Sequence, residues 1–297
     1  IITNGALDAL NLSLAAVTNP GDAVIVESPT FYAALQSLER NQLHAIEVAT
    51  HPREGIDLQA LEQAILQHRP RACWLMTTFQ NPLGSLMPDS KKEALVKLLT
   101  KHGVALIEDD VYGELYFGET RPRPAKAFDK EGIVMHCSSF SKTLAPGYRV
   151  GWVAAGRYTR KIMRNKLTTS LATAAPTQAA IAAYLEKGGF DRHLRQFRQA
   201  LALQQGELLQ AVARYFPKGT RATRPSGGYF VWVELPAQID TLKVHRAALD
   251  HGISIAPGPL FSSSGAFGNF LRLNHGHPWS VDLEQGMATL GKLLASG

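Results

Sequence analysis

The sequence of 297 residues contains only two cysteines, Cys73 and Cys137. Both lie inside apolar runs and their spacing matches no common metal site, so we expect two buried free thiols. Unpaired thiols are compatible with a reducing cytoplasm. His136, His275 and His277 also lack the spacing of metal ligands, and we expect ordinary packing or surface roles for them and no metal centre.

Long apolar segments and a starting methionine are also missing. No stretch of about 18 apolar residues occurs, so we expect no transmembrane helix and no membrane partner. The chain opens on Ile1, and its first five residues, I-I-T-N-G, read as the end of a strand already inside a fold. We therefore expect that an N-terminal segment is absent from this sequence. A targeting signal in such a segment cannot be assessed from these residues.

Charge of one sign is not concentrated in any region. The 31 Lys and Arg residues exceed the 25 Asp and Glu residues, which gives a net charge of +6, but they are dispersed. The densest basic run, 157–166, fits a solvated helix face, and an anionic partner is the alternative. With 45% hydrophobic and 19% charged residues, the composition is that of a globular protein and not of a disordered chain.

Short apolar strands and amphipathic helices alternate over the first two-thirds of the chain. The strands lack polar alternation, so both of their faces should be buried. This pattern predicts an α/β fold with a mostly parallel sheet flanked by helices. We expect strands at 23–27, 72–78, 104–108, 133–138 and 150–154, and helices at 5–17, 57–68 and 89–102.

The last third of the chain has a different pattern, which predicts a smaller α+β domain. A helix at 173–187 and the pair Gly188–Gly189 mark the joint. We therefore expect a large domain over residues 1–187 and a small domain over residues 188–297. In the small domain we expect helices at 191–216, 241–251 and 281–295 and strands at 229–234 and 269–273.

Polar side chains follow three of the expected strands. Asn81 follows the strand at 72–78, Asp109 and Tyr112 follow the strand at 104–108, and Lys142 follows the strand at 133–138. In open α/β sheets, ligands bind beyond the carboxyl ends of the strands. These side chains should therefore converge on one small-molecule site.

The segment S138-S-F-S-K-T-L-A-P-G-Y-R-V-G151 is the most informative part of the sequence. A lysine that leaves a buried strand is desolvated, which makes its amine nucleophilic. The nearby hydroxyls and Arg149 would suit a phosphate. Lys142 beside a phosphate site is the arrangement that pyridoxal 5'-phosphate (PLP) requires. A structural turn with a solvated lysine and a nucleotide site are the alternatives.

Four motifs resemble those of the class I aminotransferases, in that family's order and over nearly the whole chain. Each motif alone is weak evidence, but the ordered set is specific. The resemblance implies the PLP-dependent transferase fold of the aspartate-aminotransferase type, with PLP as cofactor. The motifs are N81-P-L-G84, D109-D-V-Y112, S139-F-S-K142 followed by P146-G-Y-R149, and F270-L-R-L-N274.

The resemblance also implies catalytic and substrate-binding roles. Lys142 would form the Schiff base with PLP and later move a proton, and Asp109 would pair with the pyridine nitrogen. Tyr112 and Asn81 would donate hydrogen bonds to the phenolic oxygen of the ring. Arg272 would bind the α-carboxylate of the substrate, with Asn81 beside it. The alternatives are a helix cap for Asp109, a turn residue for Asn81 and a structural ion pair for Arg272.

The remaining implied contacts hold the phosphate and cover the ring. Phe31 would stack on the ring, with Tyr32 as a competitor for that role. We expect Tyr229 and Phe230 to belong to the core of the small domain, with substrate contacts as the alternative. The phosphate would be held by Gly5, Ala6 and Leu7, where the first helix begins, and by Ser139 and Arg149.

Two functions can share such a site. The stretches 107–118, 138–152 and 271–279 resemble the MocR-type members of the GntR transcription factors, in particular YdcR-like proteins, more than dedicated transaminases. In that group a winged-helix DNA-binding domain precedes the aminotransferase-like domain. DNA would then be contacted only through a domain absent from this chain.

We therefore expect an effector domain of a transcriptional regulator that senses an amino acid or PLP through a Schiff base at Lys142. The alternative is a free-standing aminotransferase that moves an amino group between an amino acid and a 2-oxo acid. A third interpretation is a related PLP enzyme such as a β-lyase. A homodimer is implied by the resemblance only, and we expect a cytoplasmic location.

Overall fold

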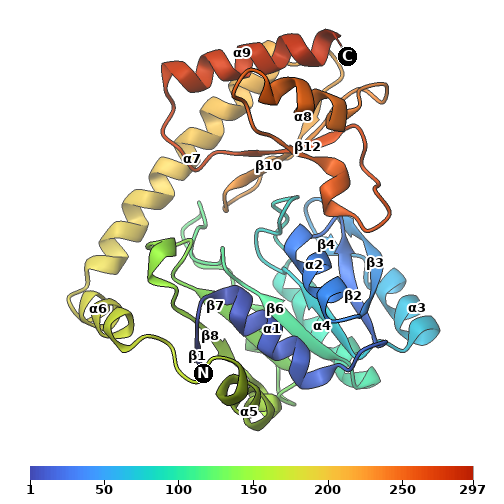
Figure 1. The fold of residues 1–297 in the computed structure, drawn as a ribbon, viewed down its shortest axis with the longest axis vertical. Helices are drawn as coiled ribbons and strands as arrows, with labels where there is room; N and C mark the ends of the chain where they lie inside the picture. Colours follow the sequence, from blue (N-terminus) through green and yellow to red (C-terminus); the bar gives the residue numbers. More distant parts are fainter. Residues whose placement is uncertain (297) are drawn as a thin grey trace.

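The computed structural model describes residues 1–296, which form two sheets (Figure 1). The larger sheet has eight strands in the order β1-β8-β7-β6-β5-β2-β3-β4. Its strands are β1 (Ile2–Thr3), β2 (Ala23–Ser28), β3 (His44–His51), β4 (Gly55–Ile56), β5 (Ala72–Leu75), β6 (Ala105–Asp109), β7 (Val134–Ser139) and β8 (Gly151–Ala154).

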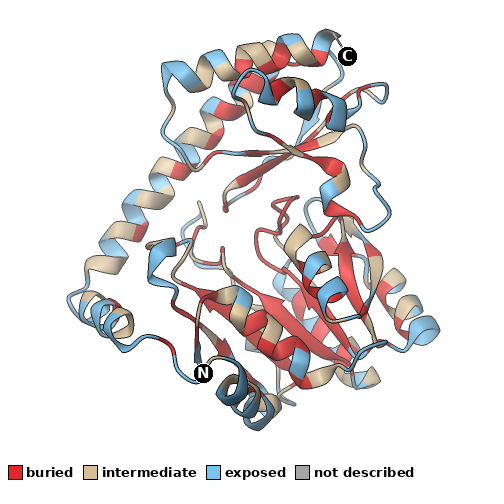
Figure 2. Ribbon diagram, in the orientation of Figure 1, coloured by how far each residue is buried: buried red, intermediate tan, exposed pale blue. Residues whose placement is uncertain are grey.

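The centre of the larger sheet is parallel and buried on both faces. Strands β3, β2, β5, β6 and β7 pair in parallel, whereas β8 pairs antiparallel with both β7 and β1. All residues of β5, β6 and β7 are buried, as the absence of polar alternation predicted (Figure 2). The prediction of an α/β fold with a mostly parallel sheet is confirmed.

Helices cover both faces of this sheet and build two hydrophobic cores. Alternate strand residues pack against α1 (Ala6–Val17), α2 (Tyr32–Arg40) and α5 (Thr159–Thr169) on one face. On the other face they pack against α3 (Leu58–His68) and α4 (Asp89–His102). Neighbouring residues Ile107 and Leu106 of β6 belong to these two opposite cores.

The sequence patterns did not single out β3 or α2. Strand β3 lies near an edge of the sheet and is only partly buried, so it lacks the continuous apolar run of the central strands. Helix α2 spans nine residues, of which only Ala34, Ser37 and Leu38 are buried. Both elements are too short or too exposed for the patterns that identified the others.

The smaller sheet has four antiparallel strands in the order β11-β12-β10-β9 and packs against helices of the last third of the chain. Its strands are β9 (Arg221–Ala222), β10 (Phe230–Glu234), β11 (Ala256–Pro257) and β12 (Phe270–Asn274). The helices that pack against it are α7 (Gly189–Tyr215), α8 (Thr241–Leu249) and α9 (Val281–Ser296). Helix α6 (Ala175–Glu186) precedes them and contacts α7. Short 3-10 helices occur at Ala125–Phe128, Pro146–Tyr148, Gly156–Tyr158 and Gly258–Phe261.

Helix α7 extends from the region of the larger sheet to the smaller sheet (Figure 1). Its early residues Leu194 and Leu201 pack in a cluster with Tyr112, whereas Leu208 and Val212 pack under the smaller sheet. Gly188, which precedes the helix, has a left-handed backbone with φ 67°. We propose the division into residues 1–187 and 188–297 at this point.

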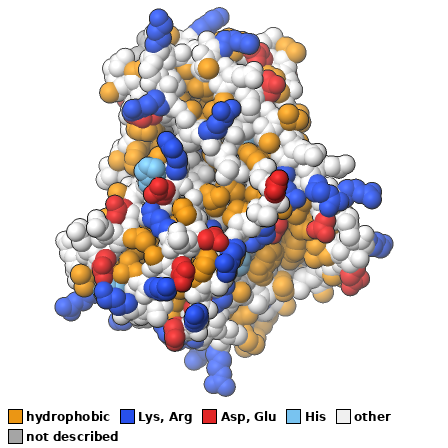
Figure 3. Space-filling view, turned by 180° about the vertical axis from the view of Figure 1, so that it is seen from behind, with side chains coloured by type: hydrophobic (Ala, Val, Ile, Leu, Met, Phe, Trp, Pro, Cys, Tyr) orange, Lys and Arg blue, Asp and Glu red, His pale blue; other side chains and the backbone are white. Residues whose placement is uncertain are grey.

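Two expectations from composition concern the thiols and the basic run. Cys73 and Cys137 are free and buried, as predicted, and burial raises the pKa of both thiols. In α5 the basic residues Arg160, Lys161 and Arg164 are exposed while Ile162 is buried, so the basic run lies on an exposed helix face, as predicted. On the face in Figure 3, basic side chains are scattered among acidic and apolar ones.

Over residues 1–296, no helix is both long and apolar enough to cross a membrane.

The core packing predicts the effect of one substitution in α3. Leu61 is fully buried there, whereas Leu66 on the same helix is 64% exposed. We expect Leu61→Ala to lower the free energy of unfolding by about 2–5 kcal/mol, because it removes buried methyl groups and leaves a cavity. Leu66→Ala should change it by no more than about 0.5 kcal/mol. Urea unfolding of both variants measures the difference, and equal losses would contradict the assigned orientation of α3.

Candidate functional site

The side chains that the sequence placed in one site do meet at one edge of the larger sheet. Strands β5, β6 and β7 are parallel, so the residues after them emerge on the same side. Thr3 of β1 pairs with Gly151 of β8, which in turn pairs with Ser139 of β7. The starts of α1 and β8 therefore lie at the same edge as the ends of the parallel strands.

Asp109 is the last residue of β6 and is almost completely buried. Its Oδ1 atom has no hydrogen-bond partner within the described residues. Burial raises the pKa of the Asp109 carboxyl to about 7, and the charge of Asp110 contributes to the shift. A buried carboxylate with a free oxygen suits a cationic or N–H-bearing ligand atom.

Tyr112 follows Asp109 by three residues and contributes a buried aromatic ring. The ring centroid lies 6.0 Å from that of Tyr229 and 5.7 Å from that of Phe230. Burial raises the pKa of the Tyr112 phenol, and the negative charge of Asp109 raises it further. The phenol is therefore neutral near pH 7 and can donate a hydrogen bond.

Lys142 lies beyond β7 in the turn that leads to the 3-10 helix Pro146–Tyr148. The residue as a whole is exposed, but desolvation lowers the pKa of its amine. The positive charge of Arg272 lowers this pKa further, and the negative charge of Asp109 raises it. The charges of both Asp109 and Arg272 therefore act on the amine of Lys142.

Arg272 connects the smaller sheet to the site. It lies in β12, and its Nη1 atom donates to Oδ1 of the buried Asn81 over 2.8 Å. Its guanidinium carbon lies 4.0 Å from the ring centroid of Phe230. The Nε atom is buried and has no partner within residues 1–296. Desolvation lowers the pKa of Arg272, so an anionic ligand would relieve an unfavourable burial of charge.

Arg149 lies against the start of α1, which builds a cationic corner at the same edge. Its Nη2 atom donates to the carbonyl of Asn4 over 3.1 Å, and its Nη1 atom donates to Ser141 Oγ over 3.3 Å. Gly5 has φ 89°, and a Cβ atom there would overlap Nη2 of Arg149. Ser139 is buried and accepts from the N–H of Ser141 over 3.3 Å.

This corner has the components of a phosphate site. The guanidinium of Arg149 lies beside the first N–H groups of α1, which begins at Ala6 and continues through Leu7. Helix N-termini and guanidinium groups both bind phosphate. The structure therefore brings together all five residues that the sequence predicted here, and adds Ser141, whose contact with Arg149 the sequence did not reveal.

Phe31 and Tyr32 contact different parts of the site. Phe31 packs in the cluster that contains Met76 and Tyr112. Tyr32 packs with Trp232 and Phe261, and its ring centroid lies 6.0 Å from the guanidinium carbon of Arg272. Phe31 is therefore the aromatic residue on the Tyr112 side, as the ring-stacking prediction requires.

The prediction that Tyr229 and Phe230 belong to the core of the small domain is wrong. Both pack in the cluster with Met76, Phe79 and Tyr112 of the larger sheet region. Tyr229 directly precedes β10, and Phe230 is its first residue. Both therefore lie at the end of β10 that is nearer to the larger sheet. Alternating apolar residues identify a strand but do not tell which neighbour it packs against.

A charged cluster lies on the other face of the sheet from Asp109. Glu108 accepts from Thr77 Oγ1 over 2.7 Å, and its Oε2 atom lies 3.2 Å from His136 Nδ1. Asp110 accepts from Arg121 Nη2 over 3.0 Å. These contacts give His136 a packing role, as expected. The described residues contain no group of three or more His, Cys, Asp or Glu side chains that could hold a metal ion.

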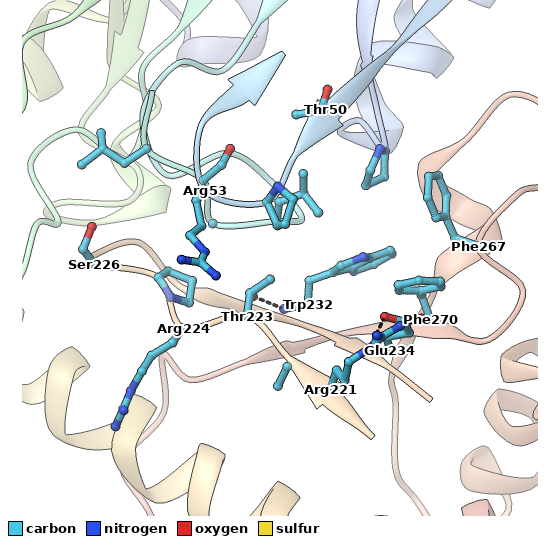
Figure 4. Close-up of a pocket in the computed structure, with 18 of the residues that line it drawn as sticks. Thr50, Arg53, Arg221, Thr223, Arg224, Ser226, Trp232, Glu234, Phe267 and Phe270 are labelled. Atoms are coloured by element: carbon cyan, nitrogen blue, oxygen red, sulfur yellow. Dashed lines mark hydrogen bonds and ion pairs between the residues drawn. The ribbon is translucent and has the colours of Figure 1, made fainter. Parts of the chain in front are cut away.

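A cleft of about 920 Å³ lies next to the site (Figure 4). Leu83 and Gly84, from the N81-P-L-G84 turn, line it on one side. Trp232 and Phe270 of the smaller sheet line the other side, and their rings are stacked with centroids 5.5 Å apart. Arg53 reaches into the cleft from the larger sheet (Figure 4). The cleft therefore lies between the N81-P-L-G84 turn and the smaller sheet, and Arg272 and Asn81 are not among the residues that line it.

Comparison with known proteins identifies a family match and several relatives. The model of the family "Aminotransferase class I and II" matches residues 1–282. The uncharacterized HTH-type transcriptional regulator YdcR of Escherichia coli is 52% identical over 294 residues. The match covers 99% of this chain but only 63% of that protein, so the chain spans less than two-thirds of this relative.

Solved structures of aminotransferases have the same fold. The α-aminoadipate aminotransferase LysN of Thermus thermophilus, complexed with N-(5'-phosphopyridoxyl)-L-leucine, superposes with a TM-score of 0.93 at 33% identity. The kynurenine aminotransferase of Pyrococcus horikoshii, in complex with PMP, superposes with a TM-score of 0.92 at 30% identity. These matches cover 99% and 100% of this chain and 76% and 74% of the two enzymes.

The raised pKa of Asp109 predicts how stability depends on pH without a ligand. Between about pH 4 and pH 7 the folded carboxyl keeps a proton that the unfolded chain has lost, so stability falls as pH rises through this window. Asp109→Asn should therefore stabilise the ligand-free chain at pH 8 by on the order of 2–4 kcal/mol and have little effect at pH 4.

Urea unfolding at several pH values measures this difference. The exposed Asp250→Asn provides the control and should leave the pH dependence unchanged. In the original chain the pKa values of Glu27 and Asp110 are also raised, to about 8 and about 6, and both groups contribute to the slope. Burial is the largest cause of both shifts, whereas the charge of Asp109 is a smaller cause of the shift of Glu27. Asp109→Asn should therefore remove the slope of Asp109 and leave most of the remaining slope. An Asp109→Asn curve parallel to that of the original chain would refute the assignment.

Proposed function

The chain belongs to the class I and II aminotransferases, and we propose that it is the PLP-binding effector domain of an HTH-type transcriptional regulator. The cofactor is PLP, which is bound by this family's fold. The observation that carries the proposal is the combination of a PLP-type site with 52% identity to a regulator, against 30–33% identity to the enzymes compared above.

The residues of the site fit this cofactor. The free, buried Oδ1 atom of Asp109 suits a protonated ring nitrogen, whose charge would compensate the cost of burying the carboxylate. Arg149, Ser139 and the N–H groups of Gly5, Ala6 and Leu7 would hold the phosphate. Tyr112 and Asn81 would donate to the phenolic oxygen, and Phe31 would cover the ring.

Each of the remaining residues has a task that follows from its surroundings. When bound, PLP supplies an aldehyde that condenses with amines and a ring that accepts electrons. Lys142 presents an amine of lowered pKa, so it can act as a nucleophile and then hold or release a proton at Nζ. Arg272, with Asn81 bonded to it, would bind the α-carboxylate of an amino acid or a 2-oxo acid.

The partners of the complete protein are part of the same proposal. DNA would be bound through a domain that lies outside this chain, because the regulator relative is longer than the matched region. A homodimer is the assembly we propose. The buried free thiols of Cys73 and Cys137 support a cytoplasmic location.

A free-standing aminotransferase is the second candidate. The observation in its favour is that enzymes at 30–33% identity superpose with TM-scores of 0.92 and 0.93. Lys142, Asp109, Tyr112 and Arg272 would then serve a cycle that moves an amino group between an amino acid and a 2-oxo acid. The two candidates differ in turnover and in the response of DNA binding.

Lys142→Ala tests the attachment of the cofactor. We expect the chain to lose the visible absorbance of lysine-bound PLP, because the variant has no amine at this point of the site. Borohydride reduction followed by intact mass measurement should find PLP fixed to the original chain and not to Lys142→Ala. The exposed Lys161→Ala should retain the attachment. Unchanged attachment in Lys142→Ala would sink the site assignment.

Arg272→Ala tests ligand sensing in the full-length protein loaded with PLP. We expect amino acids to alter its affinity for DNA, while 2-oxo acid is released slowly or not at all. Arg272→Ala should weaken amino-acid binding about 10- to 100-fold, because it removes a charged hydrogen-bonding group, and should leave PLP bound. Arg246→Ala, at an exposed position of α8, is the control. Rapid 2-oxo acid release without any effect on DNA would favour the aminotransferase.

A further inference from the structure

The turn that carries Lys142 leaves two consecutive carbonyl groups outside its own hydrogen bonds. Within this turn the N–H groups of Leu144 and Ala145 both donate to the carbonyl of Phe140, over 2.8 and 3.1 Å. The carbonyls of Lys142 and Thr143 accept from no backbone N–H in the described part of the chain. Backbone carbonyls need partners, so their partners determine how the turn is held.

Both carbonyls are bonded by side chains from other elements. The hydroxyl of Tyr229 donates to the carbonyl of Lys142 over 2.8 Å. The Nε2 atom of His193 lies 2.9 Å from the carbonyl of Thr143, and since a carbonyl only accepts, Nε2 carries the hydrogen. Tyr229 directly precedes β10 of the smaller sheet, and His193 lies in the first turns of α7.

Packing fixes the orientation of these two side chains. The rings of His193 and Phe197 are stacked with centroids 5.5 Å apart, and Phe197 lies 5.9 Å from Tyr229. Tyr229 in turn lies 6.0 Å from Tyr112. A Cβ atom at Gly276 would lie 2.7 Å from Cδ1 of Tyr229, so the ring rests closely on the backbone after β12. The hydroxyl is therefore directed by its neighbours and not by the hydrogen bond alone.

We infer that Tyr229 and His193 are positioning residues that clamp the Lys142 turn to α7 and to the smaller sheet. The ring of Tyr229 also contacts Tyr112. The clamp therefore connects Lys142 with Tyr112, both of which are proposed to face the cofactor. The clamp sets where the Lys142 backbone lies. It thereby sets how often Nζ reaches the aldehyde of bound PLP. The role of Lys142 rests on the proposed function, whereas the clamp itself is a property of the chain without cofactor.

Two measurements test the clamp, one with and one without PLP. In the cofactor-free chain, amide hydrogen exchange over 140–145 should accelerate about three- to tenfold in Tyr229→Phe and in His193→Ala, because each loses one hydrogen bond. In the PLP-loaded chain, the fraction of PLP that borohydride fixes to Lys142 should fall and the pH midpoint of its visible absorbance should shift. The total PLP bound should stay constant, since the phosphate contacts are untouched.

Two further variants serve as controls. His193→Gln keeps an N–H donor at the same number of bonds from Cα as His Nε2 and should restore much of both signals relative to His193→Ala. Tyr215→Phe removes a comparable hydroxyl, which donates to Glu284 over 2.5 Å within the small domain, and should leave both signals at the values of the original chain.

The outcomes separate this inference from the proposed function. Unchanged exchange in both Tyr229→Phe and His193→Ala overturns the clamp, and so does an equal acceleration in Tyr215→Phe. Faster exchange with an unchanged fixed fraction and pH midpoint shows a structural contact only and overturns the positioning role. If the original chain binds no PLP, the proposed function fails, and the exchange measurement still decides whether the clamp exists.

Discussion

Parallel pairing of β5, β6 and β7, with both faces buried, is the constraint on which the site depends. A strand covered on both faces has no place for a free polar side chain except at its end. The reactive residues therefore lie at the strand ends or in the loops beyond them, where the parallel direction collects Asn81, Asp109 and Lys142 at one edge. The antiparallel β8 adds Arg149 because it starts where the others end.

Consecutive acids at the end of β6 have opposite surroundings. Glu108 and Asp110 point to one face and are bonded to Thr77, His136 and Arg121. Asp109 points to the other face and keeps one buried oxygen without a partner in the described chain. Asp110 also keeps one oxygen, Oδ1, without a partner in the described chain, but its Oδ2 atom is paired with Arg121. The alternation of side chains along a strand thus separates the cluster bonded to His136 and Arg121 from Asp109 on the opposite face.

The smaller sheet completes the site through few but well-defined contacts. Arg272 bonds to Asn81, and Tyr229 bonds to the carbonyl of Lys142. Helix α7 contacts both sheets and brings His193 to the neighbouring carbonyl. A change in the relative position of the sheets would therefore move Arg272 and the Lys142 turn, which are proposed to bind a carboxylate and to supply an amine. It would affect the phosphate corner less, because the contacts of Arg149 there are with Asn4 and Ser141 of the larger sheet region.

The sequence by itself determined the parallel sheet, because runs such as A72-C-W-L and V134-M-H-C are apolar without alternation. It also determined which residues follow these strands, and so which ones meet at the edge. Tertiary structure alone decided the rest. Strand β3 and helix α2 are partly exposed and carry weak patterns, and the place of Tyr229 between the sheets depends on how β10 packs. The bonds of Tyr229 and His193 to the Lys142 turn join residues 87 and 50 positions apart, and no local pattern encodes such contacts.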